Sequence, residues 1–144
     1  MARAFALAGL LRLRQIEKEH AASDLAAANA LRRDAGERQA RAIAALHAVP
    51  VEATDASTLF AMAAARASSR SMLADLAALA AERDDQAVEA QQAFTEAKKR
   101  AVGLEKLESR HRTEVIAGDL SAEQSAIDEV ATGAWRRARE GGDA

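Results

Sequence analysis

Apolar residues recur along the middle of the chain at alternating steps of three and four residues. Twelve of the seventeen positions in this series are apolar, and the series extends over eight heptads. A sustained repeat of 3.5 residues keeps one face of a helix against a partner and winds the helices into a left-handed supercoil. The pattern therefore predicts a long coiled-coil helix. Its positions are Leu59, Met62, Arg66, Ser69, Leu73, Leu76, Ala80, Arg83, Ala87, Ala90, Phe94, Ala97, Ala101, Leu104, Glu108, His111 and Val115.

A weaker stripe with the same steps precedes the only proline, Pro50, and residues 51–102 contain neither proline nor glycine. Thr54, Asp55 or Ser57 could cap a helix that follows the proline. We therefore expect an all-α fold, an antiparallel two-helix coiled coil with unequal helices. The single hairpin has a helix over about 3–48, a turn over about 49–55 and a helix over about 56–139. The first stripe comprises Leu25, Ala28, Arg32, Ala35, Gln39, Ala42, Leu46 and Val49.

Composition argues against a globular enzyme. Of the 144 residues, 49% are hydrophobic, but 40 are alanine and only three Phe and one Trp supply aromatic bulk. The chain has no cysteine, its three histidines lie far apart, and no apolar run is long enough to cross a membrane. No phosphate-binding loop or nucleophile motif is present. We expect no catalytic residues, no metal, no cofactor and no small-molecule substrate.

Basic residues cluster at Lys98-Lys99-Arg100, but glutamates interleave with them and the net charge is −2. Nucleic-acid binding is therefore not expected. The same charges, at spacings of three and four, predict ion pairs along one helix, such as Glu96 with Lys99 and Glu108 with Arg112.

Both ends of the chain carry apolar residues. The N-terminal segment, which includes Phe5 and Leu11, either covers the facing helix or stays exposed to engage a partner or a membrane surface. After Val115 the stripe moves by one residue, and Gly118 predicts a kink or skip at this join. The final thirty-odd residues should extend beyond the first helix, with Trp135 as a plausible interface anchor. This shifted stripe comprises Ile116, Leu120, Glu123, Ile127, Val130 and Ala134.

Three segments resemble the flagellar FliJ family of small cytoplasmic export proteins. The opening residues 5–19 read FALAGLLRLRQIEKE, residues 98–112 read KKRAVGLEKLESRHR and residues 123–131 read EQSAIDEVA. The resemblance implies an antiparallel coiled coil similar to the central stalk of a rotary ATPase. It also implies a cytoplasmic protein, associated peripherally with the inner-membrane type III export apparatus, that inserts its paired ends into the hexameric export ATPase and stimulates it.

The same resemblance implies links to the cytoplasmic domain of the export gate and to export chaperones. Charge complementarity makes the basic and acidic residues of the two end motifs, together with Trp135, the candidate ATPase contacts. They are Arg12, Arg14, Lys18, Glu123, Asp128 and Glu129. Location near the turn alone suggests Leu46, Leu59 and Phe60 as a gate-binding surface. The alternatives are a stalk protein of an injectisome and a generic coiled-coil scaffold or prefoldin-like holdase.

Overall fold

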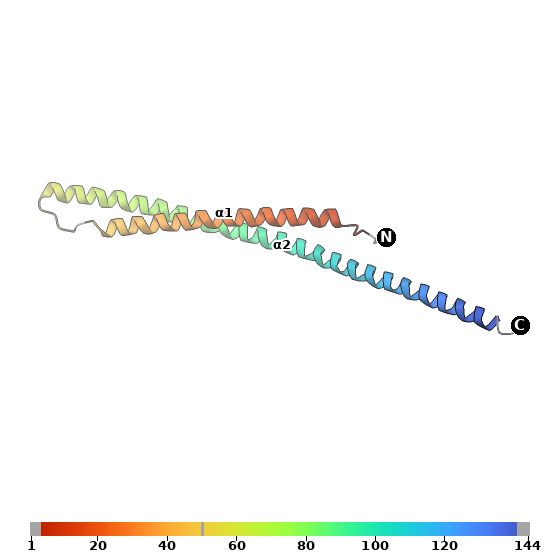
Figure 1. The fold of residues 1–144 in the computed structure, drawn as a ribbon. Coiled ribbons are helices and arrows are strands. Elements are labelled where there is room, and N and C mark those ends of the chain that lie inside the picture. Colours follow the sequence, from red (N-terminus) through yellow and green to blue (C-terminus); the bar gives the residue numbers. More distant parts are fainter. Residues whose placement is uncertain (1–3, 50, 141–144) are drawn as a thin grey trace. The chain divides into compact units, whose positions relative to one another are not determined.

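The computed structural model describes residues 4–49 and 51–140. They form two helices, α1 over Ala8–His47 and α2 over Ala56–Glu140, of 40 and 85 residues. The chain reverses direction between them, so α1 and α2 run antiparallel (Figure 1). The expected all-α hairpin with unequal helices is confirmed. Pro50 and residues 141–144, where we expected part of the turn and a frayed tail, lie outside the described residues.

Asp55 begins α2. Its Oδ1 accepts a hydrogen bond from the Thr58 backbone N–H at 2.7 Å, and its carbonyl accepts one from Leu59 N at 3.1 Å. The side-chain bond satisfies a donor that has no backbone partner within the helix, and the bond from Leu59 is the first backbone bond of the helix. The Thr58 N–H bond, which favours the ionised carboxylate, is the main reason that the pKa of Asp55 lies below its usual value. Of the three capping residues predicted, Asp55 performs this function.

The chain divides into two compact units, and the larger one comprises residues 15–99. In this unit the two helices meet through alanine, with Ala35 and Ala87 both buried. An ion pair between the helices joins Arg32 to Asp84, with 3.9 Å between Arg32 Nε and Asp84 Oδ1. Small side chains allow the two backbones to approach closely but bury little area per residue.

The second unit comprises the start of α1, up to Arg14, and the part of α2 that begins at Arg100. Leu11 is 7% exposed, Ala101 is fully buried, and the Phe5 ring lies 5.6 Å from the His111 ring. α1 begins at Ala8 rather than close to residue 3, and its first turn contains no acidic residue. The helix therefore lacks the favourable charge that stabilises an N-terminus.

The predicted stripe on α2 is its packing face. Fifteen of its seventeen positions are buried or half-buried, and the two exposed ones are Leu59 and Arg66. On α1, all stripe positions except Arg32 are buried or half-buried. We call this packing face the seam.

α2 continues through Gly118 as one helix, and the kink or skip expected at this join stays a prediction. A glycine in a helix costs about 1 kcal/mol relative to alanine but still donates its backbone hydrogen bond. Beyond Gly118 the Ser125 hydroxyl donates to the Ser121 carbonyl within the helix.

Candidate functional site

Chemistry-bearing side chains do not cluster in the described part of the chain. It contains no group of three or more His, Asp or Glu arranged to hold a metal ion. Within the same residues, no buried side-chain nitrogen or oxygen lacks a hydrogen-bond partner. None of its helices has the length and apolar composition needed to cross a membrane. The candidate sites are therefore exposed faces of the two helices.

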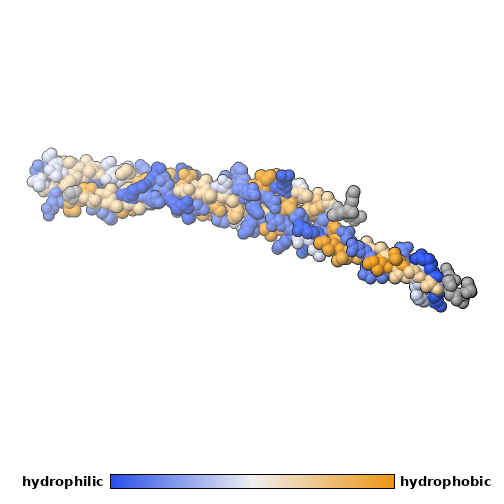
Figure 2. Space-filling model, in the orientation of Figure 1, coloured by the Kyte–Doolittle hydropathy of each residue, from blue (hydrophilic) through white to orange (hydrophobic). Residues whose placement is uncertain are grey.

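Residues 116–139 of α2 form the most extensive exposed face, and we call them the uncovered segment. Every described position in it is exposed except Gly133, which is half-buried. Large apolar side chains remain in contact with solvent here, and Figure 2 shows their hydrophobic surface on this part of α2. Such exposure on a soluble helix typically marks an interaction site. The four aliphatic residues concerned are Ile116, Leu120, Ile127 and Val130.

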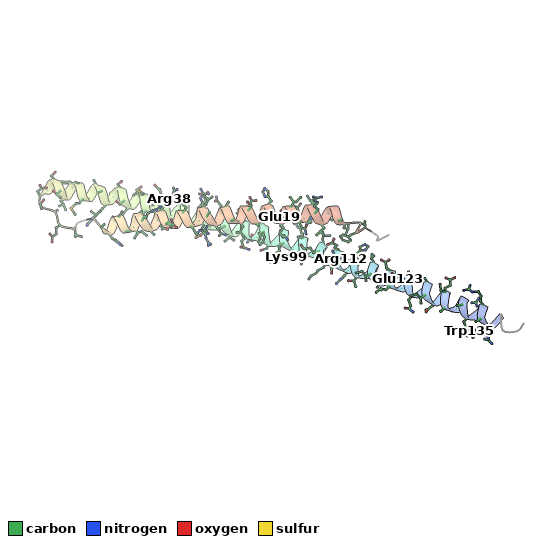
Figure 3. The ribbon with its side chains drawn as sticks, viewed as in Figure 1. Glu19, Arg38, Lys99, Arg112, Glu123 and Trp135 are labelled. Carbon is green, nitrogen blue, oxygen red and sulfur yellow. The ribbon has the colours of Figure 1, made fainter. Side chains whose placement is uncertain are left out.

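The predicted acidic contacts all lie on this segment. Glu123, Asp128 and Glu129 are exposed, and Figure 3 shows Glu123 on α2. The Asp128 carboxylate accepts a hydrogen bond from Gln124 Nε2 at 3.3 Å, and its backbone carbonyl accepts one from the Thr132 hydroxyl at 2.7 Å. These bonds are local to the helix, so the carboxylates remain accessible to a partner.

Trp135, also labelled in Figure 3, is 58% exposed. The guanidinium of Arg139 lies over its ring, 4.5 Å from the centroid. Arg139, one turn after Trp135, makes this contact because positions i and i+4 share a face of a helix. The tryptophan therefore presents a ring that is partly covered by its own chain.

The three basic candidates on α1 differ in exposure. Arg12 is exposed, whereas Arg14 and Lys18 are half-buried and each has an interaction within the chain. Steps of three and four lead from Leu11 through Arg14 and Lys18 to Ala21 and Leu25, which continues the α1 seam toward the N-terminus. The predicted stripe begins at Leu25, so the seam positions of Arg14 and Lys18 were not predicted.

The N-terminal apolar segment satisfies both interpretations in part. Leu11 covers the facing helix, but Leu7, Leu10 and Leu13 are exposed. Next to Phe5 and His111 a groove of about 300 Å³ opens, and Glu108, Val115 and Ile116 also line it. This groove is open to solvent and contains no arrangement of catalytic groups.

Two of the three turn-proximal candidates are strongly exposed. Phe60 is 77% exposed, Leu59 is also exposed and Leu46 is half-buried. Leu46 lines a groove of about 290 Å³ with Val49, Val51 and Arg66, among others, and neither Leu59 nor Phe60 lines this groove. The structure therefore does not bring the three candidates into one pocket.

The predicted ion pairs along α2 are confirmed. Lys99 Nζ lies 2.9 Å from Glu96 Oε1, and Arg112 Nη2 lies 3.7 Å from Glu108 Oε2 (Figure 3 labels Lys99 and Arg112). Exposed pairs of this kind stabilise a helix by only a few tenths of a kcal/mol each. This part of the basic run thus serves the helix itself.

No protein-family model, no curated protein and no solved structure matches this chain.

Proposed function

We propose that this protein is a non-enzymatic stalk and adaptor of the flagellar type III export apparatus. In this role it binds and stimulates the export ATPase ring in the cytoplasm, at the inner membrane, and links it to the export gate and to export chaperones. The resemblance of residues 5–19, 98–112 and 123–131 to the FliJ family supports the proposal.

The structural observation that carries the proposal is the combination of a thin helical hairpin with an uncovered segment. That segment bears the motif of residues 123–131 on an exposed face of α2. A coiled coil can couple two machines through its ends without catalytic groups of its own. The exposed aliphatic side chains and the carboxylates of Glu123, Asp128 and Glu129 supply the apolar and acidic chemistry that such a docking surface needs.

The test is the ATP hydrolysis rate of the same organism's flagellar export ATPase with and without this protein. We expect stimulation by the intact chain and loss of stimulation on reversing the exposed charge of Arg12 (Arg12→Glu). Arg14 and Lys18 are unsuitable first targets, because both have interactions within the hairpin. Arg33→Glu, which changes another exposed arginine of α1, is the matched control and should stimulate normally.

The proposal fails if the intact protein neither binds nor stimulates the ATPase while circular dichroism shows that it is helical. An injectisome ATPase assayed in parallel distinguishes the related stalk function, since only the cognate enzyme should respond.

The holdase alternative is favoured by one observation, the exposed apolar residues Val51, Leu59 and Phe60 near the start of α2. A holdase suppresses the aggregation of an unfolded client protein when no ATPase is present. Phe60→Ser should reduce that protection. Suppression by the intact chain combined with no effect on the ATPase would make this alternative the better one.

A further inference from the structure

We infer that the uncovered segment is a self-association surface, on which two copies of this chain pair antiparallel through the shifted stripe and its next position, Arg137. This inference concerns the free protein and does not depend on the proposed function. It rests on the direction of the stripe, on its symmetry and on the distribution of charge along residues 116–139.

The shifted stripe lies on a face of α2 that α1 cannot cover. Successive residues of an α-helix are turned by about 100°. The step from Val115 to Ile116 therefore turns the stripe about 100° away from the face against which α1 packs. An apolar helix face of this kind requires a helix that approaches from a different direction.

The spacing of the shifted stripe suits pairing with a second copy of the same stripe. From Leu120 to Arg137 its steps are 3, 4, 3, 4 and 3, so this part of the stripe matches itself when a second copy is inverted about a two-fold axis between Asp128 and Glu129, which sets Leu120 beside Arg137 of the second copy and leaves Ile116 outside the paired positions. Ile127 then meets Val130 of the second copy, and Glu123 meets Ala134 of the second copy. A two-fold interface uses the same patch on both copies, as this arrangement requires.

The distribution of charged residues along the uncovered segment favours a second copy as the partner. Between Thr113 and Trp135 the chain carries five acidic residues and no lysine or arginine, and the next residues include Arg136, Arg137 and Arg139. Antiparallel pairing places Arg137 of one copy one layer away from Glu123 of the other copy, so that the two opposite charges lie close together. Parallel pairing would set arginine against arginine. Complementary charge therefore selects a second copy in the antiparallel orientation.

The residues that flank the stripe permit close approach. Ala117, Ala126, Ala131 and Ala138 lie beside it, together with Gly133. The guanidinium of Arg137 folds back over Gly133, with Nη1 3.8 Å and Nη2 3.9 Å from the position that a Cβ on Gly133 would occupy. The arginine therefore lies along the helix surface, beside the layer that would contact the second copy.

If the proposed function holds, self-association covers Glu123 on the surface that would dock on the ATPase. The dimer would then be a state of the free protein that competes with ATPase binding. Because the pairing itself is measured without any ATPase, its failure and the failure of the proposed function are distinguishable.

The first experiment uses introduced cysteines, since the natural chain has none. Full-length Glu123→Cys and Ala134→Cys variants are oxidised separately and as a mixture. Antiparallel pairing predicts a disulfide in the mixture only, because the two copies of residue 123 would lie about 16 Å apart along the axis. Efficient homodisulfides in each separate sample would indicate parallel pairing and overturn the inference.

The second experiment measures mass by sedimentation equilibrium over a concentration series. We expect a dimer of twice 15.2 kDa that Glu123→Arg or Arg137→Glu each weakens about tenfold. The double variant Glu123→Arg/Arg137→Glu should restore the dimer to within about threefold, since coupled sites are non-additive. Within one helix the two positions lie about 21 Å apart, so rescue reports contact between copies.

Arg136→Glu is the matched control, because it makes the same charge change on the neighbouring arginine, which points about 100° away from Arg137. It should leave the dimer constant unchanged. A mass of 15.2 kDa throughout the series, a failure of the double variant to rescue, or equal weakening by Arg136→Glu would each overturn the inference.

Discussion

The two stretches of α2 on either side of Val115 belong to one continuous helix and have similar apolar spacing, yet they differ in what covers them. Between Ala101 and Val115 the stripe packs against the start of α1, and Ala101 is fully buried. Beyond Val115 the shifted stripe stays exposed although it carries the large apolar residues Ile116, Leu120, Ile127 and Val130. Apolar spacing thus identifies the face of a helix that packs, while the presence of a partner decides whether that face is buried.

The largest difference between the two stretches should appear when one charge is introduced into each. We expect Ala101→Asp to lower the free energy of unfolding by about 3 kcal/mol, because it places a carboxylate in a contact with no room for water. Ala122→Asp, at an exposed position away from the shifted stripe, should lower it by about 0.6 kcal/mol, the difference in helix propensity alone. Chemical denaturation followed by circular dichroism measures both. Equal losses would show that the seam near Ala101 is not packed.

The next effect separates two neighbouring leucines on α1. Leu11 is buried and Leu10 is exposed. Leu11→Ala should cost about 2 to 3 kcal/mol of unfolding free energy, whereas Leu10→Ala should cost less than about 1 kcal/mol. Urea denaturation of the two variants measures the difference. The reverse order would place the opposite face of the α1 start against α2.

A smaller effect is expected at the Asp55 cap, where α2 begins. Because the folded pKa of Asp55 is lowered, its carboxylate contributes stability that is fully present above the unfolded pKa of about 3.9 and is lost as the pH falls through the folded pKa. Asp55→Ala should therefore lower the Tm at neutral pH, and the difference from the natural chain should shrink below about pH 4. Thermal scans across this pH range measure it.

Asp55→Asn is the control for this prediction. It keeps an oxygen that can cap the helix but removes the titrating group. Its Tm should lie between those of the natural chain and Asp55→Ala at neutral pH. A Tm difference for Asp55→Ala that is independent of pH would contradict the role of the ionised carboxylate.

The smallest effect concerns the contact between Trp135 and Arg139 in the uncovered segment. Arg139→Ala should change the unfolding free energy by less than about 0.5 to 1 kcal/mol, as is typical of an exposed cation–π contact. It should nevertheless increase quenching of Trp135 fluorescence by acrylamide, because the guanidinium partly covers the ring. Arg136→Ala, which changes an adjacent arginine, should leave the quenching unchanged. Equal quenching in both variants would show that Arg139 does not cover the ring in solution.

The features that the sequence predicted are those that depend on local spacing. The α2 stripe, the Asp55 cap and the Glu96–Lys99 and Glu108–Arg112 pairs all follow from residues a few positions apart. The contacts between helices depend on register, which the small alanine side chains in the seam specify only weakly. The Arg32–Asp84 ion pair and the Phe5–His111 contact were for this reason not predicted.

The candidate site was predicted less completely than the fold. The exposed positions of Glu123, Asp128 and Glu129 follow from the end of α1 coverage, which the unequal helix lengths already implied. Arg14 and Lys18 were grouped with Arg12 because all three are basic residues of the opening motif and charge complementarity was the ground for choosing contacts. Their seam positions become clear only when the steps of three and four are counted backward from Leu25 to Leu11.

Because α2 runs through Gly118 as one continuous helix, the direction in which each of its side chains points depends on the number of residues that precede it in the helix. Deleting Val115 would place Ile116 at its position, rotate everything that follows by about 100° and bring the shifted stripe into line with the seam. Side-chain chemistry would be unchanged, but the segment would offer its apolar residues toward a different side of the molecule. Variation in length at this join, more than substitution, is therefore the change with which evolution or an engineer could redirect the contacts of the segment.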